Sequence, residues 1–265
     1  MQQLNEELIN KAKELLNSNK VERILGWKKG LFEEDIAPAV FENAEELEKD
    51  FIYDERYCGN LVKFLMRHKT HKTGIFLRPK FIYSYNQLLK EHRINEDEVV
   101  IIELPESEKD KEEKENRFKE VERFEKLSEN ERYEFWKKEF SRCIRCNACR
   151  DICPACTCEK CVFDNNKLYT SQKVAQNSFE ESLYHIIRAC HVAGRCTDCG
   201  ECSRVCPEHI PLYLLNRKYI KDINELYGDY QAGSSFDDKP PMLTFKEDDA
   251  EPSVVYERDK TGGDR

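Results

Sequence analysis

Two cysteine runs with the same spacing constrain this chain more than any other feature. The first run is Cys143-x2-Cys146-x2-Cys149-x3-Cys153 followed by Pro154, and the second is Cys196-x2-Cys199-x2-Cys202-x3-Cys206 followed by Pro207. Twelve of the thirteen cysteines lie between the first and last of these positions, and the first twenty residues do not have the pattern of a secretory signal. Because disulfide frameworks belong to oxidising compartments, this arrangement predicts metal ligation in a reducing one.

A cubane iron–sulfur cluster accounts for every cysteine in the two runs. In two-cluster ferredoxins the fourth cysteine of each run ligates the other cluster. The spacing therefore predicts two [4Fe–4S] clusters, one held by Cys143, Cys146, Cys149 and Cys206 and the other by Cys196, Cys199, Cys202 and Cys153. Paired zinc sites are the alternative, but zinc needs only two Cys-x2-Cys pairs and leaves the third cysteine and the proline of each run unexplained.

Three more cysteines follow the first run, namely Cys156, Cys158 and Cys161. They could bind a third cluster or a zinc ion, with Cys190 or Cys58 as the fourth ligand. The alternative is that they are free thiols packed beside the clusters. We favour this interpretation, since buried cysteine behaves as a small hydrophobe. The histidines at 185 and 191 do not share a helical face and are expected to be structural.

The fold class indicated by the rest of the chain is α+β. Apolar runs at 74–77 and 98–104 predict buried strands, and residues 83–92 between them predict a helix, which together favour a parallel βαβ unit. Helical spacing is also present at 5–17, 44–52, 60–68, 179–194 and 212–228, and residues 106–140 predict a charged helical connector.

These elements predict four segments along the chain. They are a small N-terminal α/β docking domain (1–105), the connector (106–140), a mostly helical ferredoxin-like domain with two [4Fe–4S] clusters (141–228) and an extended tail (229–265). The length of 265 residues suits about two folded units. The tail carries too few apolar side chains to form a core of its own.

Composition excludes several classes of function. A formal charge of −9 disfavours nucleic acid as a partner. No stretch approaches 18 consecutive apolar residues, so we expect no membrane insertion and a cytoplasmic location. The common glycine-rich nucleotide motifs, the nucleophile elbow and the paired-histidine zinc motif are absent from the sequence, and no catalytic residue can be assigned.

Three parts of the chain resemble known iron–sulfur subunits. The segments CIRCNACRDICPACTCEKC and AGRCTDCGECSRVCPEHIPLYLLNRK, with the βαβ region before them, are similar to β-subunits of deazaflavin-linked hydrogenases and formate dehydrogenases and to iron–sulfur subunits of sulfhydrogenases and anaerobic sulfite reductases. The long helical insert between the runs is also similar to the α-helical ferredoxin domains of succinate dehydrogenase and heterodisulfide reductase subunits. The resemblance implies electron transfer between a partner's flavin or clusters and a catalytic subunit.

The chain departs from that group at two positions. Relatives commonly have cysteine after the Arg-Pro of the first βα turn and after the proline that ends the second strand, whereas here Lys80 and Glu106 stand there. These departures remove two cysteines that could serve a further site, and the flavin-binding C-terminal domain of the full-length β-subunits has no counterpart after Cys206. We therefore expect this chain to bind no flavin. We expect a non-catalytic electron-transfer subunit of an anaerobic formate dehydrogenase, hydrogenase or heterodisulfide-reductase-like complex, with flavin-containing and catalytic subunits as partners. The alternative is a redox enzyme subunit whose N-terminal α/β domain binds flavin or substrate.

Overall fold

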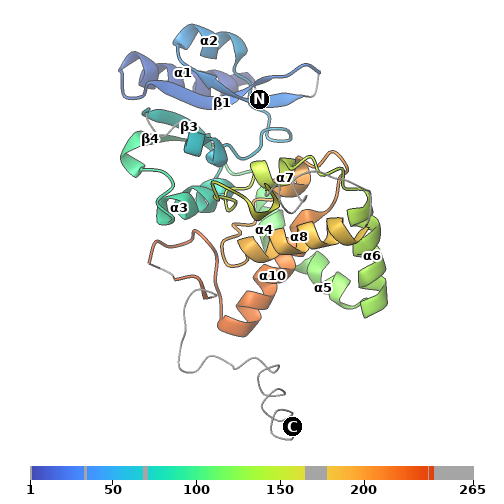
Figure 1. The fold of residues 1–265 in the computed structure, drawn as a ribbon. Helices are drawn as coiled ribbons and strands as arrows, with labels where there is room; N and C mark the ends of the chain where they lie inside the picture. Colours follow the sequence, from blue (N-terminus) through green and yellow to red (C-terminus); the bar gives the residue numbers. More distant parts are fainter. Residues whose placement is uncertain (1, 33–34, 68–70, 165–177, 238, 242–265) are drawn as a thin grey trace, which may run out of the picture.

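A four-stranded sheet and a set of helices make up the protein (Figure 1). The structure is a computed structural model, and it describes residues 2–32, 35–67, 71–164, 178–237 and 239–241. We call residues 2–104 the sheet half and residues 105–241 the helical half. The mixed α/β class that the sequence predicts is confirmed, whereas the division of the chain into four segments stays a prediction.

The sheet half alternates strands with helices and short 3-10 turns. In chain order it contains α1 (Gln2–Asn17), β1 (Arg23–Lys29), β2 (Ile36–Phe41), α2 (Ala44–Asp50), η1 (Val62–Arg67), β3 (Thr73–Leu77), η2 (Pro79–Phe81), α3 (Ile82–Lys90), η3 (Glu96–Glu98) and β4 (Val99–Glu103). The order of strands in the sheet is β2-β1-β3-β4. Figure 1 shows α1 and α2 on the side of the sheet away from the helical half and α3 on the side towards it.

The parallel βαβ unit expected from the sequence is confirmed. Strands β3 and β4 run parallel with Ile75 opposite Ile101, and α3 forms the crossover between them. All five residues of β3 are buried, because the strand lies between two neighbours in the sheet and is covered on both faces. The carboxyl ends of both strands point towards the helical half, so this edge of the sheet lies next to the cysteine loops (Figure 1).

Two elements differ from the sequence expectation. Strand β2 pairs antiparallel with β1 at the edge of the sheet, although sequence analysis assigned no strand there. It contains Pro38, which only an edge strand tolerates because proline lacks the backbone donor. The helix expected at 60–68 is a 3-10 turn over Val62–Arg67, with residue 68 outside the described residues, and the side chain of Asn60 accepts the Val62 N–H at 2.9 Å.

An aromatic cluster forms the centre of the sheet half. The rings of Phe51 and Phe76 lie 4.5 Å apart between centroids, and Trp27 lies 5.6 Å from Tyr53. Helix α1 adds Leu8 and packs against β1 and β4. This continuous core makes the sheet half a rigid support for the loops at its carboxyl edge.

The helical half begins with three helices where the sequence predicts one charged connector. They are α4 (Glu108–Glu115), α5 (Lys119–Glu125) and α6 (Glu129–Ser141), followed by α7 (Ala148–Asp151), η4 (Val162–Asp164), α8 (Ser178–Val192), α9 (Glu201–Arg204) and α10 (Leu212–Tyr227). Ser107 and Ser128 cap α4 and α6, and Ser128 forms a capping box with Glu131. Helix α6 packs against α8 and buries Phe140, so this segment covers the cysteine region and is more than a solvated linker.

The first part of the predicted tail lies against the chain's own surface. Tyr230 donates its hydroxyl hydrogen to the Gly194 carbonyl at 3.0 Å, and the Asn86 amide donates to the Gly233 carbonyl at 2.9 Å. Gly233 has a φ of +78°, and a Cβ there would collide with the Tyr83 carbonyl. The tail therefore passes within backbone contact of α3, while residues 242–265 lie outside the described part of the chain.

Among the helices that the structure describes, none combines the length and apolar character that crossing a bilayer requires.

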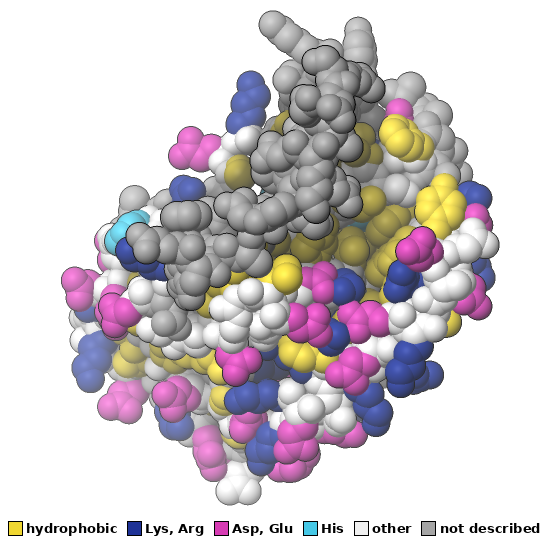
Figure 2. All heavy atoms as spheres, turned by 90° about the horizontal axis from the view of Figure 1, so that it is seen from below, with side chains coloured by type: hydrophobic (Ala, Val, Ile, Leu, Met, Phe, Trp, Pro, Cys, Tyr) yellow, Lys and Arg dark blue, Asp and Glu magenta, His cyan; other side chains and the backbone are white. Residues whose placement is uncertain are grey.

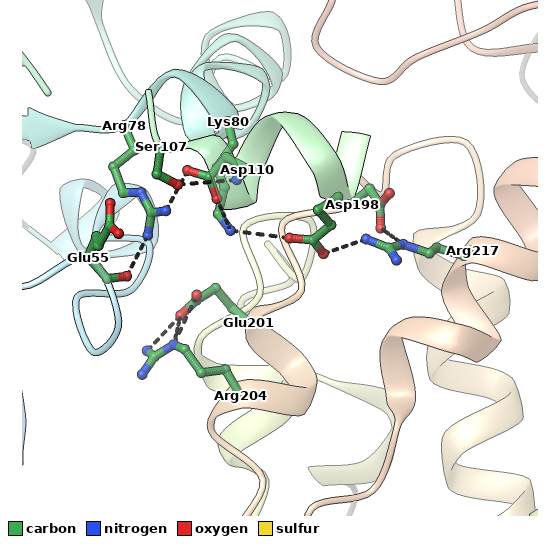
Figure 3. Close-up of polar contacts among 10 residues, drawn as sticks. Glu55, Arg78, Lys80, Ser107, Asp110, Asp198, Glu201, Arg204 and Arg217 are labelled. Carbon is green, nitrogen blue, oxygen red and sulfur yellow. Dashed lines mark hydrogen bonds and ion pairs between the residues drawn. The ribbon is translucent and has the colours of Figure 1, made fainter. Parts of the chain in front are cut away.

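A network of ion pairs joins the two halves at the carboxyl edge of the sheet (Figure 3). Arg78, which follows β3, pairs with the buried carboxylate of Asp110 on α4 and donates to the Glu55 carbonyl at 3.1 Å. Lys80 lies 2.9 Å from the same Asp110 carboxylate. Burial opposes ionisation of Asp110, but Lys80 and Arg78 outweigh it and lower its pKa.

The same network reaches the second cysteine run through Asp198. This aspartate accepts from Arg117 and from Arg217, each at 2.8 Å, and Arg217 also contacts Glu113 of α4 at 2.7 Å. Two helices, α4 and α10, and the turn that follows α4 are therefore tied to one loop between two predicted cluster ligands. Because both Asp198 and its arginine partners are largely buried, these ion pairs hold the loop in place relative to the sheet.

We expect Asp110→Asn to lower the free energy of unfolding by about 3 kcal/mol, because it leaves two buried or half-buried cations without their carboxylate. Since the pKa of Asp110 is lowered in the folded state, its contribution is present above the unfolded pKa of about 3.9 and is lost as the pH falls from there through the lower folded pKa. Urea unfolding under anaerobic conditions at pH 7 measures the first effect, and a series that extends below the unfolded pKa measures the second. Glu108→Gln, on the exposed side of the same helix, is the control and should change the value by less than about 0.5 kcal/mol.

Candidate iron–sulfur site

The two cysteine runs adopt the same backbone conformation. In the first run Arg145 and Asn147 have positive φ values of 55° and 64°, and in the second run Asp198 and Gly200, at the equivalent positions, have values of 57° and 74°. Each run then enters a one-turn helix, α7 or α9. Alternation of left-handed and right-handed residues turns successive N–H groups to one side and creates an anion-binding concavity of the kind found at iron–sulfur sites.

The loop of the first run places its cysteines in different environments. The Arg145 backbone N–H donates to the Cys143 sulfur at 3.4 Å, so the loop already directs a main-chain donor at a thiolate position. Helix α7 carries Cys149, which is buried together with Cys143, whereas Cys146 is exposed. One predicted ligand of this set therefore faces the surface.

One pocket unites the first ligand set that the sequence predicts. Cys143, Cys146, Cys149 and Cys206 all line it, and its other walls include Tyr184, His185, Ile210 and Leu212. Cys206 comes from the second run, 57 residues after Cys149 in the chain. The structure thus brings the fourth cysteine of the second run to the first three of the other run.

The second predicted set is also brought together. Cys153 and Cys196 pack in one small apolar cluster with Val192, and Cys153 lies close enough to raise the pKa of Cys196, Cys199 and Cys202. Burial is the largest cause of each increase, and for Cys202 the pKa reaches about 11 even though Arg188 opposes the shift. Buried thiols of this kind stay protonated unless a cation or metal pays for their charge by direct coordination.

The three additional cysteines lie together, but their suggested fourth ligands do not. Cys156, Cys158 and Cys161 line one cavity of about 480 Å³. Cys190 is exposed and lies 2.9 Å from the Tyr219 hydroxyl, and Cys58 is buried in the sheet half near the Ile52 carbonyl. Across the residues that the structure describes, no group of three or more His, Cys, Asp or Glu side chains is arranged to hold a single metal ion.

Helix α8 presents two buried polar side chains that lack partners. Within the described residues, neither ring nitrogen of His185 and none of the three guanidinium nitrogens of Arg188 has a hydrogen-bond partner. His185 stacks on Phe140 with centroids 4.8 Å apart, and burial lowers its pKa to about 3, with Arg188 and Arg145 adding to the decrease. His185 is therefore a neutral donor at the wall of the first pocket.

These orphaned groups test whether the site fits iron–sulfur clusters. A cluster with four thiolates is anionic and accepts hydrogen bonds at its sulfurs. The backbone N–H of Arg145 donates to Cys143, the neutral imidazole of His185 lines the pocket of the first set, and the unpaired guanidinium of Arg188 lies near cysteines of both sets. The donor chemistry of the pocket therefore fits an anionic sulfur cofactor.

Sequence reasoning missed Arg188 and chose apolar positions of α8 that are mainly exposed. The helix is expected from the spacing of Phe179, Leu183, Ile186, Ile187 and Cys190. Phe179, Leu183 and Ile186 are exposed at 74%, 43% and 44%, whereas Ile187 packs against the core of the helical half. The buried side chains of this helix are Glu181, Tyr184, His185, Arg188, Ala189 and Val192, which are spaced along one helical face. Inspection of the sequence could have found the arginine as a charged residue among small and aromatic ones on a single helical stripe.

The exposed stripe of α8 borders an apolar hollow on the underside of the helical half. A cavity of about 630 Å³ is lined there by Val121, Phe124, Trp136, Ile186 and Leu214, together with neighbouring residues of α5, α6, α8 and α10. Hydrophobic side chains gather in a hollow in the space-filling view of this side (Figure 2).

Comparison with known proteins adds a second line of support. No family model matches the sequence. The chain is similar to β subunits of F420-dependent formate dehydrogenases. The similarity to the protein of that name from Methanocaldococcus jannaschii is 36% identity over 103 residues, which are 37% of this chain and 26% of the relative. A formate dehydrogenase 1 β subunit from Methanococcus maripaludis is 30% identical over 112 residues, which are 42% of this chain and 27% of that protein. The aligned part thus spans about a quarter of the length of these relatives.

We expect Cys153→Ser to damage the cluster of Cys196, Cys199 and Cys202, because Cys153 packs with Cys196 and is not among the residues that line the pocket of Cys143, Cys146 and Cys149. Cys206→Ser should damage the other cluster. Paramagnetic resonance of the reduced variants distinguishes the two losses. Cys190→Ser is the matched control and should keep the full iron content, and loss of the local cluster in either variant would contradict the crossed assignment.

Proposed function

We propose that this chain is an electron-transfer subunit that relays single electrons through two [4Fe–4S] clusters. The observation that carries the proposal is the repeated left-handed loop of the two cysteine runs, with the fourth cysteine of each run placed beside the first three of the other. The donors in the walls of the site add support, since they suit an anionic sulfur cofactor.

In this proposal Cys143, Cys146, Cys149 and Cys206 hold one cluster, and Cys196, Cys199, Cys202 and Cys153 hold the other. When bound, each cluster exchanges one electron at a time with a donor or an acceptor. The residues around the thiolates exclude water and supply hydrogen bonds, while the loop geometry fixes where the sulfurs lie. Both roles belong to the protein and tune a chemistry that the cofactor provides.

We place this subunit in an oxidoreductase complex of the formate dehydrogenase type. The similarity to β subunits of F420-dependent formate dehydrogenases supports this placement. Flavin-containing and catalytic subunits would be its partners, because clusters carry single electrons while formate and hydrogen release pairs. Hydrogenase and heterodisulfide-reductase-like complexes have partners of the same chemistry.

The sheet half would dock a partner and direct the clusters towards it. Its carboxyl edge reaches the Thr197–Asp198 loop through α4, so a subunit bound at the sheet is fixed relative to the second cluster. Lys80, at a position where the subunits that the sequence resembles are expected to have cysteine, forms ion pairs with Asp110 and Glu113. Its ammonium group stabilises the junction and offers no redox chemistry.

A second candidate function is a redox enzyme subunit that binds flavin or a small substrate in the sheet half. One observation favours it, namely a cavity of about 500 Å³ beside the carboxyl edge of the sheet, lined by Lys80, Tyr83, Glu106, Asp110 and Asp198 among others. Open α/β sheets bind ligands at this edge. Fluorescence of the supernatant after acid treatment decides between the two functions, because released flavin fluoresces and iron–sulfur clusters do not.

We expect the purified chain to contain about eight irons and eight acid-labile sulfides and to take up about two electrons from a strong reductant. It should turn over neither formate, hydrogen nor reduced nicotinamide with an artificial acceptor, since no site for a two-electron step is assigned. Iron and sulfide analysis with an anaerobic assay of the isolated chain tests both statements. Stoichiometric zinc, about four irons, or turnover in material free of other subunits would overturn the proposal.

A further inference from the structure

Arg188 lies between the two cysteine sets. Helix α8 occupies the middle of the helical half (Figure 1), and the Arg188 side chain leaves its buried face with only 4% of the residue exposed. The cysteines close enough to interact electrostatically with Arg188 come from both sets, with Cys149 from the first and Cys153 and Cys202 from the second. A single guanidinium is therefore near ligands of both proposed clusters.

The charge of Arg188 is not neutralised by a carboxylate. No ion pair to Arg188 is found among the residues that the structure describes, and its three nitrogens lack hydrogen-bond partners there. Burial by itself lowers the pKa of a guanidinium, yet the neighbouring thiols of Cys202, Cys149 and Cys153 hold the pKa of Arg188 above its usual value. The groups near Arg188 that could balance its charge are thus cysteine sulfurs, which become anionic when they bind a cluster.

Other arginines close to the cysteine loops differ in this respect. Arg145 pairs with Glu181 at 3.0 Å, Arg217 pairs with Asp198 at 2.8 Å, and Arg195 donates to Glu91 at 2.7 Å. Each of these cations is balanced by a carboxylate, so its net effect on a nearby cluster is small. Arg188 is the arginine among them that retains an unbalanced charge.

We propose that Arg188 is the shared counter-charge of both clusters, donating N–H groups to sulfurs of the two ligand sets and raising both reduction potentials. The proposal rests on the function proposed above. Each cluster gains one electron from a donor on reduction and becomes more negative, while Arg188 keeps its proton. A fixed positive charge in a poorly solvated site favours the reduced form, and hydrogen bonds to sulfur act in the same direction.

The position of the residue also predicts that the two clusters respond together. Cys149 and Cys202 belong to different sets, and the same guanidinium acts on both. Lysine would retain the charge but could not present the planar fork of donors that reaches two sites at once. Substitution by glutamine therefore removes the positive charge, whereas substitution by lysine keeps the charge and removes the planar arrangement of donors.

The test compares Arg188→Gln and Arg188→Lys with the wild-type full-length chain in redox titrations followed by paramagnetic resonance. We expect Arg188→Gln to lower the reduction equilibrium constant of both clusters tenfold or more, which is about 59 mV for each tenfold change in a one-electron couple. Arg188→Lys should shift both constants by less than about threefold, because its charge is preserved. Arg132→Gln, on α6 and bonded to the Glu125 carbonyl, is the matched control and should leave both potentials unchanged.

The outcomes separate this inference from the function on which it rests. Unchanged potentials in Arg188→Gln with about eight irons bound would overturn the role of Arg188 alone, and a shift at one cluster only would overturn the shared role. If Arg188→Gln loses its clusters, the Arg188→Lys variant decides. Wild-type iron content and wild-type potentials in Arg188→Lys support the proposed role of the positive charge, and loss of either one refutes it. Failure of the wild-type chain to bind iron would reject the proposed function together with this assignment.

Discussion

The balance of negative charge on buried sulfur governs the helical half of the protein. Eight cysteines from two runs lie close together, and burial raises the pKa of four of them, Cys149, Cys196, Cys199 and Cys202. The surroundings offer backbone N–H groups in left-handed loops, an imidazole and one unpaired guanidinium. With the proposed clusters bound, these donors acquire acceptors, so the cofactor and its binding site satisfy each other's unmet interactions.

The remainder of the structure positions these loops. Glu91 at the end of α3 binds Arg195 just before the second run, and Thr157 beyond the first run joins the same group. Asp110 and Asp198 connect the sheet edge to the second run through α4. The sheet half thus contacts both runs through polar groups, whereas its own aromatic core holds the strands in place.

Local patterns in the sequence predicted the regular elements and failed where tertiary context decides. Strands β3 and β4 are continuous apolar runs, and α1, α8 and α10 follow helical spacing, so these elements were legible. Edge strand β2 was missed, since Pro38 within it argues against a strand unless its place at the edge is known. The segment 106–140 reads as a solvated connector because its apolar residues are few, yet Val121 and Phe140 are buried against the cysteine region.

The candidate site shows the same division. The spacing of the two runs predicts which cysteines meet. In the structure Cys206 lines one pocket with Cys143, Cys146 and Cys149, and Cys153 packs with Cys196. The apolar pattern of α8 misled, because the buried face of this helix carries charged and polar residues such as Arg188 and His185, which suit a helix beside the proposed anionic clusters. Hydrophobic periodicity assumes that the interior is apolar, and it therefore points to the wrong face here.

The crossed grouping of the cysteines has a consequence for biogenesis. In the proposed assignment the first set takes its fourth sulfur from Cys206, at the far end of a segment that spans 64 residues from Cys143, and the second set takes one sulfur from Cys153 in the first run. During synthesis Cys143, Cys146 and Cys149 leave the ribosome well before Cys206 exists, and Cys153 leaves well before its three partners. In this arrangement cluster insertion waits for both runs, and a chain that is truncated between them can complete neither cluster.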